Sequence, residues 1–341
     1  MPDSARLKKL ARAYMAAHPG TAYQQALHAI SGDDPSRAEN FLAGAPRAAA
    51  PGQLELAALL GVTTPRDVRT NYARPDTDLN VPLGVTSDGT VVTINIDTVS
   101  QGRGGTGAHG VVSGITGSGA TSLAFTIALA LRARNSPGRL QVALIDPSHR
   151  IDAATADSVA DVVLPTAAMA AEWVTEQITA RVNYLRSADA RDINDLPDGE
   201  LPRLLVIAVD EPKDVGDSTP PTSTWTVLQS ICRVGRAVGI HLLLLCAYSS
   251  PRDLHKVDSN LCYRISLRQQ DDALTCALLW VGPDDDLVQS VRTAPQGVAF
   301  LQTSYADQPA TVQRFTMATG HDTLRKMIQA ARSHVRVASG R

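Results

Sequence analysis

The chain has 341 residues, of which 44% are hydrophobic and 4% aromatic, so it can bury a substantial core that is mostly aliphatic. Its formal net charge of −2 gives no overall attraction to nucleic acid or to an anionic membrane. No apolar run approaches the roughly 20 residues that a membrane-spanning helix needs, and the polar start of the chain is unlike a signal peptide. We therefore expect a cytoplasmic protein with one large domain and a smaller appendage.

The N-terminal part is predicted to form a small helical segment of its own. Apolar side chains recur at helical spacing in residues 4–17 and again in residues 21–31, with a turn between the two stretches. Residues 32–51 are rich in proline, alanine and aspartate, which is typical of a linker. We assign residues 1–45 to a helical hairpin and linker, and residues 46–341 to the main domain.

Apolar strands alternate with helices through most of the main domain. The predicted strands lie at about residues 90–96, 110–113, 140–145, 204–209, 241–246, 262–267 and 297–301. The predicted helices lie at about residues 54–60, 120–134, 168–187, 223–237, 270–279 and 321–337. Strands that are apolar throughout are typical of a parallel sheet with helices on both faces. The sequence therefore predicts an α/β fold with a mainly parallel sheet.

A glycine-rich loop follows the second predicted strand and leads directly into a helix. It reads Gly114-Ile115-Thr116-Gly117-Ser118-Gly119-Ala120-Thr121, in the strand–loop–helix context of a P-loop. Glycines let backbone N–H groups converge on a phosphate, and the helix N-terminus adds partial positive charge. We assign nucleotide binding to Gly114, Thr116, Gly117, Ser118, Gly119, Ala120, Thr121 and Ser122. The Thr121 hydroxyl is the expected Mg²⁺ ligand. For this segment alone, an ordinary glycine-rich turn is the alternative.

Two acidic residues follow the apolar strand at residues 204–209. Asp210 would hold Mg²⁺, directly or through water, and Glu211 would orient and deprotonate an attacking water. The alternative is that both acids simply cap the next turn. Their position downstream of a P-loop favours the catalytic interpretation.

Several further segments resemble one family. They read Asn80-Val81-Pro82-Leu83-Gly84, Val209-Asp210-Glu211, Arg233-Val234-Gly235-Arg236 followed by Gly239-Ile240-His241-Leu242-Leu243-Leu244, and residues 258–268. With the P-loop, they resemble the FtsK/SpoIIIE superfamily, and more closely the ATPase domains of EccC, the motor of type VII (ESX) secretion. The resemblance runs from about residue 51 to residue 316.

The resemblance implies a RecA-like P-loop fold with ATP and Mg²⁺ as cofactors. It also implies an oligomer with other FtsK/SpoIIIE-like ATPase subunits, and an exported protein as a substrate. Any membrane role would come through partners. Carried over by position, Arg233 or Arg236 would be an arginine finger that reaches the nucleotide of a neighbouring subunit. A solvated surface charge is the alternative for each arginine.

Three positions depart from the family pattern. Ala120 stands where the P-loop lysine would bridge the β- and γ-phosphates. The strand that ends at Asp146 leads into Pro147-Ser148-His149-Arg150, where the family usually has Asp-Phe-Lys followed by glycines. Ala247 stands at about the place of a polar sensor. The three departures predict hydrolysis that is weak or absent. The two acids after residue 209 argue the other way.

The main functional hypothesis is an ATPase-fold protein that binds or once bound ATP in a translocation or type VII secretion assembly. One alternative is an active DNA or protein translocase whose P-loop lysine was replaced by Ala120 through engineering. Another is a DNA-binding FtsK-like protein of a mobile element. That protein would use basic residues of the first and last helices, Arg6, Lys8, Lys9, Arg12, Arg325, Lys326, Arg332 and Arg336.

Overall fold

The computed structural model of the protein describes residues 55–97, 105–209, 224–246, 254, 257–305 and 308–338. The helical hairpin predicted within residues 1–45 lies outside these ranges. In the ranges described, no helix combines the length and the apolar character needed to cross a membrane.

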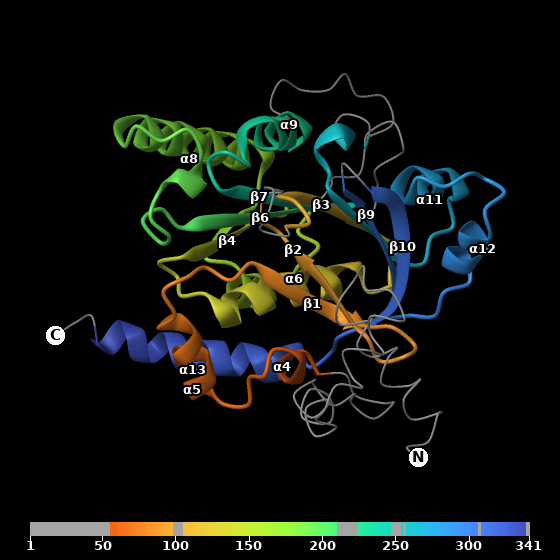
Figure 1. The fold of residues 1–341 in the computed structure, drawn as a ribbon, viewed down its shortest axis with the longest axis horizontal. Helices are drawn as coiled ribbons and strands as arrows, with labels where there is room; N and C mark the ends of the chain where they lie inside the picture. Colours follow the sequence, from red (N-terminus) through yellow and green to blue (C-terminus); the bar gives the residue numbers. More distant parts are fainter. Residues whose placement is uncertain are drawn as a thin grey trace, which may run out of the picture. The chain divides into compact units, whose positions relative to one another are not determined.

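A ten-stranded sheet forms the centre of the described domain, in the order β2-β1-β10-β9-β8-β3-β7-β6-β4-β5 (Figure 1). Its parallel part contains β8 (Tyr263–Ser266), β3 (His109–Ser113), β7 (Ile240–Cys246), β6 (Arg203–Val209), β4 (Leu140–Ile145) and β5 (Val162–Leu164). An antiparallel part extends it with β9 (Val298–Tyr305), β10 (Gln308–Met317), β1 (Asn80–Val85) and β2 (Val91–Asn95). The predicted mainly parallel α/β fold is confirmed.

Helices cover both faces of the sheet (Figure 1). One face packs against α4 (Leu56–Leu59), α5 (Pro65–Tyr72), α6 (Ala120–Arg134), α7 (Ala153–Val159) and α13 (His321–Ala338). The other packs against α8 (Ala167–Ser187), α9 (Thr224–Val234), α11 (Asp272–Leu279) and α12 (Asp286–Arg292). Short 3₁₀ turns occur at Ile193–Asp195 and Asp258–Asn260. Alternate residues of one strand therefore enter different cores, as Val112 and Val111 do. This explains why the central strands are apolar throughout.

The predicted helix at residues 223–237 ends earlier than expected, at Val234. Gly235 donates its N–H to the Ile231 carbonyl at 2.7 Å, and Gly239 adopts a φ of +71°. Gly239 turns the chain into β7, because glycine adopts a positive φ without steric cost. At Gly235, a Cβ would lie only 2.5 Å from the Ile231 carbonyl oxygen and 2.7 Å from that of Ile240.

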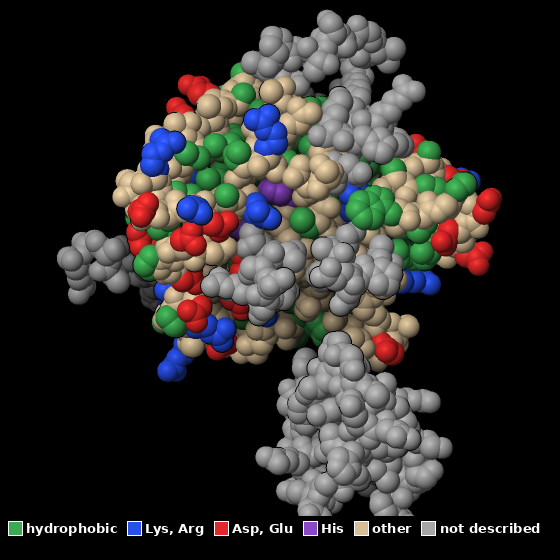
Figure 2. Space-filling view, turned by 45° about the horizontal axis from the view of Figure 1, so that its top comes forward, with side chains coloured by type: hydrophobic (Ala, Val, Ile, Leu, Met, Phe, Trp, Pro, Cys, Tyr) green, Lys and Arg blue, Asp and Glu red, His purple; other side chains and the backbone are tan. Residues whose placement is uncertain are grey.

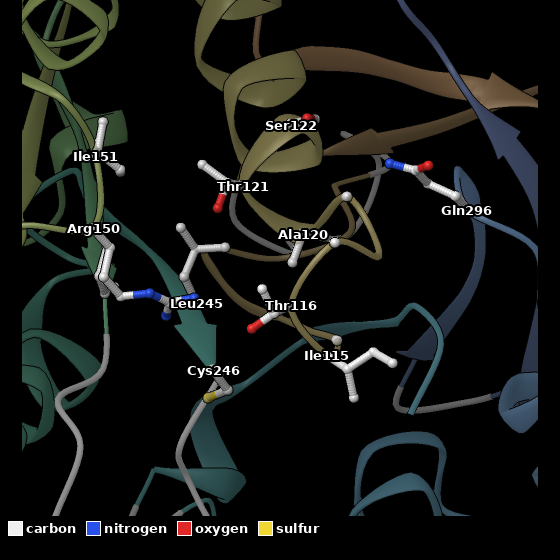
Figure 3. Close-up of a pocket in the computed structure, with 14 residues that line it drawn as sticks. Ile115, Thr116, Ala120, Thr121, Ser122, Arg150, Ile151, Leu245, Cys246 and Gln296 are labelled. Carbon is white, nitrogen blue, oxygen red and sulfur yellow. The ribbon is translucent and has the colours of Figure 1, made fainter. Parts of the chain in front are cut away.

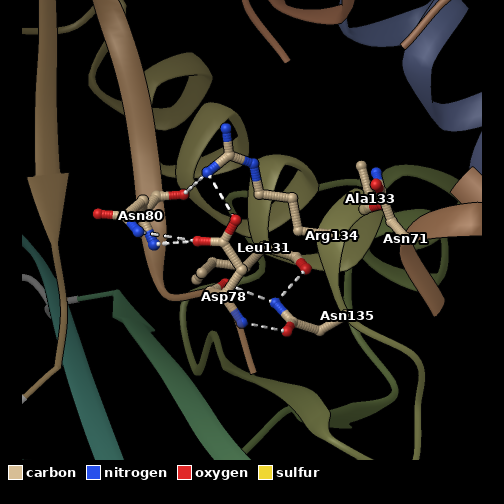
Figure 4. Close-up of polar contacts among 7 residues, drawn as sticks. All are labelled: Asn71, Asp78, Asn80, Leu131, Ala133, Arg134 and Asn135. Atoms are coloured by element: carbon tan, nitrogen blue, oxygen red, sulfur yellow. Dashed lines mark hydrogen bonds and ion pairs between the residues drawn. The ribbon is translucent and has the colours of Figure 1, made fainter. Parts of the chain in front are cut away.

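Helix α6 is the most deeply buried helix segment around the sheet, since residues 123–133 are all buried. Its C-terminal end is fastened to the segment before β1 (Figure 4). Asn135 exchanges two hydrogen bonds with the Asp78 backbone, at 2.7 and 2.8 Å, and Arg134 Nη1 lies 3.1 Å from Asp78 Oδ2. Asn71 Nδ2 donates to the Ala133 carbonyl at 3.1 Å. These bonds satisfy backbone groups that a helix end leaves without partners, so the position of α6 is fixed.

We expect Asn135→Ala to lower the free energy of unfolding by about 1 to 3 kcal/mol, because it leaves the part-buried backbone N–H and carbonyl of Asp78 without these partners. Asn183→Ala, at an exposed site on α8, is the matched control and should change stability by less than about 0.5 kcal/mol. Urea unfolding followed by circular dichroism measures both. Equal midpoints for the two variants would show that the Asn135 bonds do not hold the helix end.

Candidate functional site

The loop after β3 folds over the N-terminus of α6. Its start is fixed by the Ile115 N–H, which donates to the Arg268 carbonyl at 3.0 Å. Gly117 and Gly119 have φ values of +82° and +108°, a region that residues with a side chain rarely adopt. Gly119 is the residue that caps α6, and no side chain accepts from the first N–H groups of the helix there. These N–H groups therefore remain available, and the helix dipole favours an anion beside them.

A cavity of about 250 Å³ opens at this helix end (Figure 3). It is lined by Gly114, Ile115, Thr116, Gly117, Gly119, Ala120, Thr121, Ser122, Arg150, Ile151, Val209, Leu245, Cys246 and Gln296. The hydroxyls of Thr116 and Thr121 point toward the space between the loop and Arg150 (Figure 3). The described lining thus combines backbone donors, the hydroxyls of Thr116 and Thr121, and the cation of Arg150, which is a donor set suited to phosphate.

The structure brings most of the predicted nucleotide-binding residues to this cavity, but it does not place Ser118 there. The Ser118 side chain is 1% exposed and lies against Gly114, where an added Cβ would be 2.3 Å from Ser118 Oγ. The Ser118 N–H donates to the Ile115 carbonyl at 3.0 Å. The Ser118 side chain therefore packs inside the loop and does not face the cavity. Its N–H is already bonded within the turn.

A buried polar network holds the loop to its neighbouring strands. Ser113 Oγ donates to the Cys246 carbonyl at 2.9 Å and accepts from Gln269 Nε2 at 2.7 Å. Gln269 is 4% exposed, so these bonds are shielded from water. Sequence reasoning missed Gln269 and also Gln296, which lines the cavity from the segment before β9. Neither residue belongs to a local motif, and both are brought to the loop only by the sheet order.

The predicted acids follow a strand that reaches the cavity. Val209, the last residue of β6, lines the cavity, and Asp210 and Glu211 come next in the chain. Both acids lie outside the described residues, as does Ala247 after β7. Their assigned roles remain predictions.

The two predicted finger arginines lie apart from the cavity in this subunit. Arg233 and Arg236 are exposed at the end of α9 and in the turn after it, and neither lines the cavity. Burial and, to a smaller extent, the charge of Arg236 lower the pKa of His109 to about 4. His109 begins β3, so Arg236 lies toward the opposite end of that strand from the glycine loop. Any action on a nucleotide would therefore be on that of a neighbouring subunit.

The basic residues considered for DNA binding are partly neutralised. In α13, Arg325 pairs with Asp322 at 3.0 Å and Arg332 pairs with Asp161 at 2.7 Å. On the face shown in Figure 2, basic and acidic side chains are interspersed. The basic residues of the predicted first helix lie outside the described ranges. The described part of the last helix gives no support to a basic nucleic-acid surface.

Three comparisons relate this arrangement to known proteins. The model of the FtsK/SpoIIIE family matches residues 67–210. The ESX-4 secretion system protein EccC4 of Mycobacterium tuberculosis is 35% identical over 207 residues, which are 56% of this chain and 16% of EccC4. The DNA translocase SftA of Bacillus subtilis is 28% identical over 180 residues, 49% of this chain and 18% of SftA. The chain therefore spans less than a fifth of the length of either relative.

A solved structure shows the same fold over most of the chain. The cytoplasmic domain of the Thermomonospora curvata type VII secretion ATPase EccC superposes with a TM-score of 0.66 and 25% identity, covering 81% of this chain and 34% of that one. Residues 67–210 therefore match the FtsK/SpoIIIE family, and the chain has an ATPase-type fold similar to that of the EccC proteins.

Proposed function

We propose that this chain is an ATP-binding domain of a type VII secretion assembly in which hydrolysis is weak or absent. The observation that carries the proposal is the cavity at the uncapped N-terminus of α6, where the glycine loop meets the helix and Ala120 is the first helical residue. Gly117 and Gly119 give the loop a backbone shape that residues with a side chain rarely adopt, and this shape accompanies an uncapped helix end that can accept an anion.

The donor set fits a nucleotide phosphate chain with Mg²⁺. The backbone N–H groups from Gly117 to Thr121 would bind phosphate oxygens, apart from the N–H of Ser118, which is used in the turn. The Thr121 hydroxyl and Asp210 would hold the metal, and Glu211 would orient the attacking water. Bound Mg²⁺ supplies neutralisation of phosphate charge.

The missing lysine affects catalysis more than binding. Backbone donors and a helix dipole contact the phosphates in the ground state, whereas a lysine between the β- and γ-phosphates also stabilises charge that develops during transfer. Removing one such donor typically slows catalysis by about a hundredfold to a thousandfold. Weak hydrolysis with retained binding is the expected result of Ala120.

The proposed partners are other FtsK/SpoIIIE-like ATPase subunits, in a homo- or hetero-oligomer that handles an exported protein. Arg233 and Arg236 support this, because they are exposed and distant from the cavity of their own subunit. Family members such as EccC4 are much longer than this chain, so the domain would act beside others.

We expect millimolar ATP with Mg²⁺ to raise the melting temperature by at least about 2 °C, because a ligand that binds only the folded state stabilises it. Thr121→Ala should remove the Mg²⁺-dependent part of the shift. Thr175→Ala, at an exposed site on α8, is the control and should keep it. Differential scanning fluorimetry measures the shifts, and a wild-type protein that does not respond to ATP would contradict the proposal.

We expect Ala120→Lys to raise the rate of ATP hydrolysis by at least about tenfold, because it returns a cation to the β- and γ-phosphates. Adding Glu211→Gln should cancel the gain, since the general base is lost. A coupled phosphate-release assay at saturating ATP gives the rates. Wild-type turnover as fast as that of the lysine variant would refute the expectation of weak hydrolysis.

A further inference from the structure

The segment after β4 faces the glycine loop across the cavity. We infer that Arg150 supplies the cationic contact to the terminal phosphates that the P-loop itself lacks. The inference rests on the proposed ATP binding, and it assigns a function to residues 147–150, whose sequence departs from the family pattern.

The backbone of this segment is held in a fixed shape by one buried carboxylate. Asp146, 4% exposed at the end of β4, accepts hydrogen bonds from the N–H groups of Arg150 at 3.1 Å and Ile151 at 2.8 Å. The His149 N–H donates to the Asp146 carbonyl at 3.2 Å, and His149 has a φ of +51°, which closes the turn. Arg150 therefore projects from an ordered backbone, and the loop is built around Asp146.

The far side of the segment is fastened as well. Asp152 caps α7 by accepting from the Thr155 N–H at 3.0 Å. Ile151 is partly buried against the core that contains α6. Arg150 thus lies between two fixed points, so little backbone entropy would be lost when its side chain binds a ligand.

The side chain of Arg150 extends toward Thr116 at the cavity (Figure 3). Of the described residues that line the cavity, Arg150 alone carries a charge. Ala120 lines the same cavity with a single methyl group, so it leaves space where a lysine side chain would otherwise lie. Among the described lining residues, the one cation therefore comes from the β4 side.

The chemistry of arginine suits this place. A guanidinium donates two parallel hydrogen bonds to a phosphate and cannot lose its proton at physiological pH. A cation on the β4 segment approaches the phosphates from a different direction than a lysine at the start of α6. Arg150 can therefore replace the lysine in ground-state binding of the phosphates. It does not take the lysine's place between the β- and γ-phosphates, which favours phosphoryl transfer.

The experiment is ATP binding, measured by calorimetry with Mg²⁺ on the full chain. The variants are Arg150→Ala, Arg150→Lys, and Arg150→Ala combined with Ala120→Lys. Arg186→Ala removes the same charge from an exposed site on α8 and is the control. Melting temperatures without nucleotide show whether each variant folds as the wild type does.

We expect Arg150→Ala to weaken ATP binding by about tenfold to a hundredfold, the effect of losing a charge-assisted contact. Arg150→Lys should lose less ATP affinity than Arg150→Ala. The double variant should recover at least half of the affinity that Arg150→Ala loses, measured on a logarithmic scale. Arg186→Ala should bind as the wild type does. Recovery by a lysine on α6 separates a phosphate contact from a merely structural role of Arg150.

Wild-type-like ATP binding by Arg150→Ala would overturn this inference and leave the proposed function standing. Absence of ATP binding by the wild type would overturn the proposed function, and this inference with it. Failure of the double variant to recover any affinity would also overturn the inference, because the loss would then come from a changed loop.

Discussion

The placement of α6 is the constraint on which the rest of the site depends. Its middle is buried between the sheet and α13, and its C-terminal end is closed by Asn71 and Asn135. Its N-terminal end, by contrast, is left without a side-chain cap, above the carboxyl ends of the parallel strands. The C-terminal end of the helix is therefore fixed by side-chain hydrogen bonds, whereas the N–H groups at its N-terminal end are unpaired. This asymmetry favours an anion ligand even without a lysine.

Sequence reasoning predicted the parallel strands other than the three-residue β5, for a physical reason. Strands such as β6 and β7 are covered on both faces, so every residue is apolar and the signal is strong. The antiparallel strands are different, because β10 carries polar residues such as Gln313 and Arg314 among its apolar ones. Its pairing with β1 joins segments more than two hundred residues apart, which no local pattern encodes.

The candidate site was predicted in part. The glycine loop is local in sequence, so its residues could be named in advance. Ser118 is the exception, because its side chain is buried and does not line the cavity. Gln269, Gln296 and Arg150 reach the same place through the sheet order, and only the three-dimensional arrangement reveals them. Residues 147–150 illustrate the point best. As sequence they suggest loss of function, whereas in the fold they form a supported turn that places a cation in the cavity.

The central claim is that the glycine loop binds the phosphates of ATP although Ala120 replaces its lysine. Hydrogen–deuterium exchange with and without saturating ATP and Mg²⁺ tests this claim most directly, because it reports on the amide groups that would hold the phosphates. The account predicts slower exchange in peptides covering residues 114–122 and 147–151, with no change in α8. Unchanged exchange at residues 114–122 would contradict it.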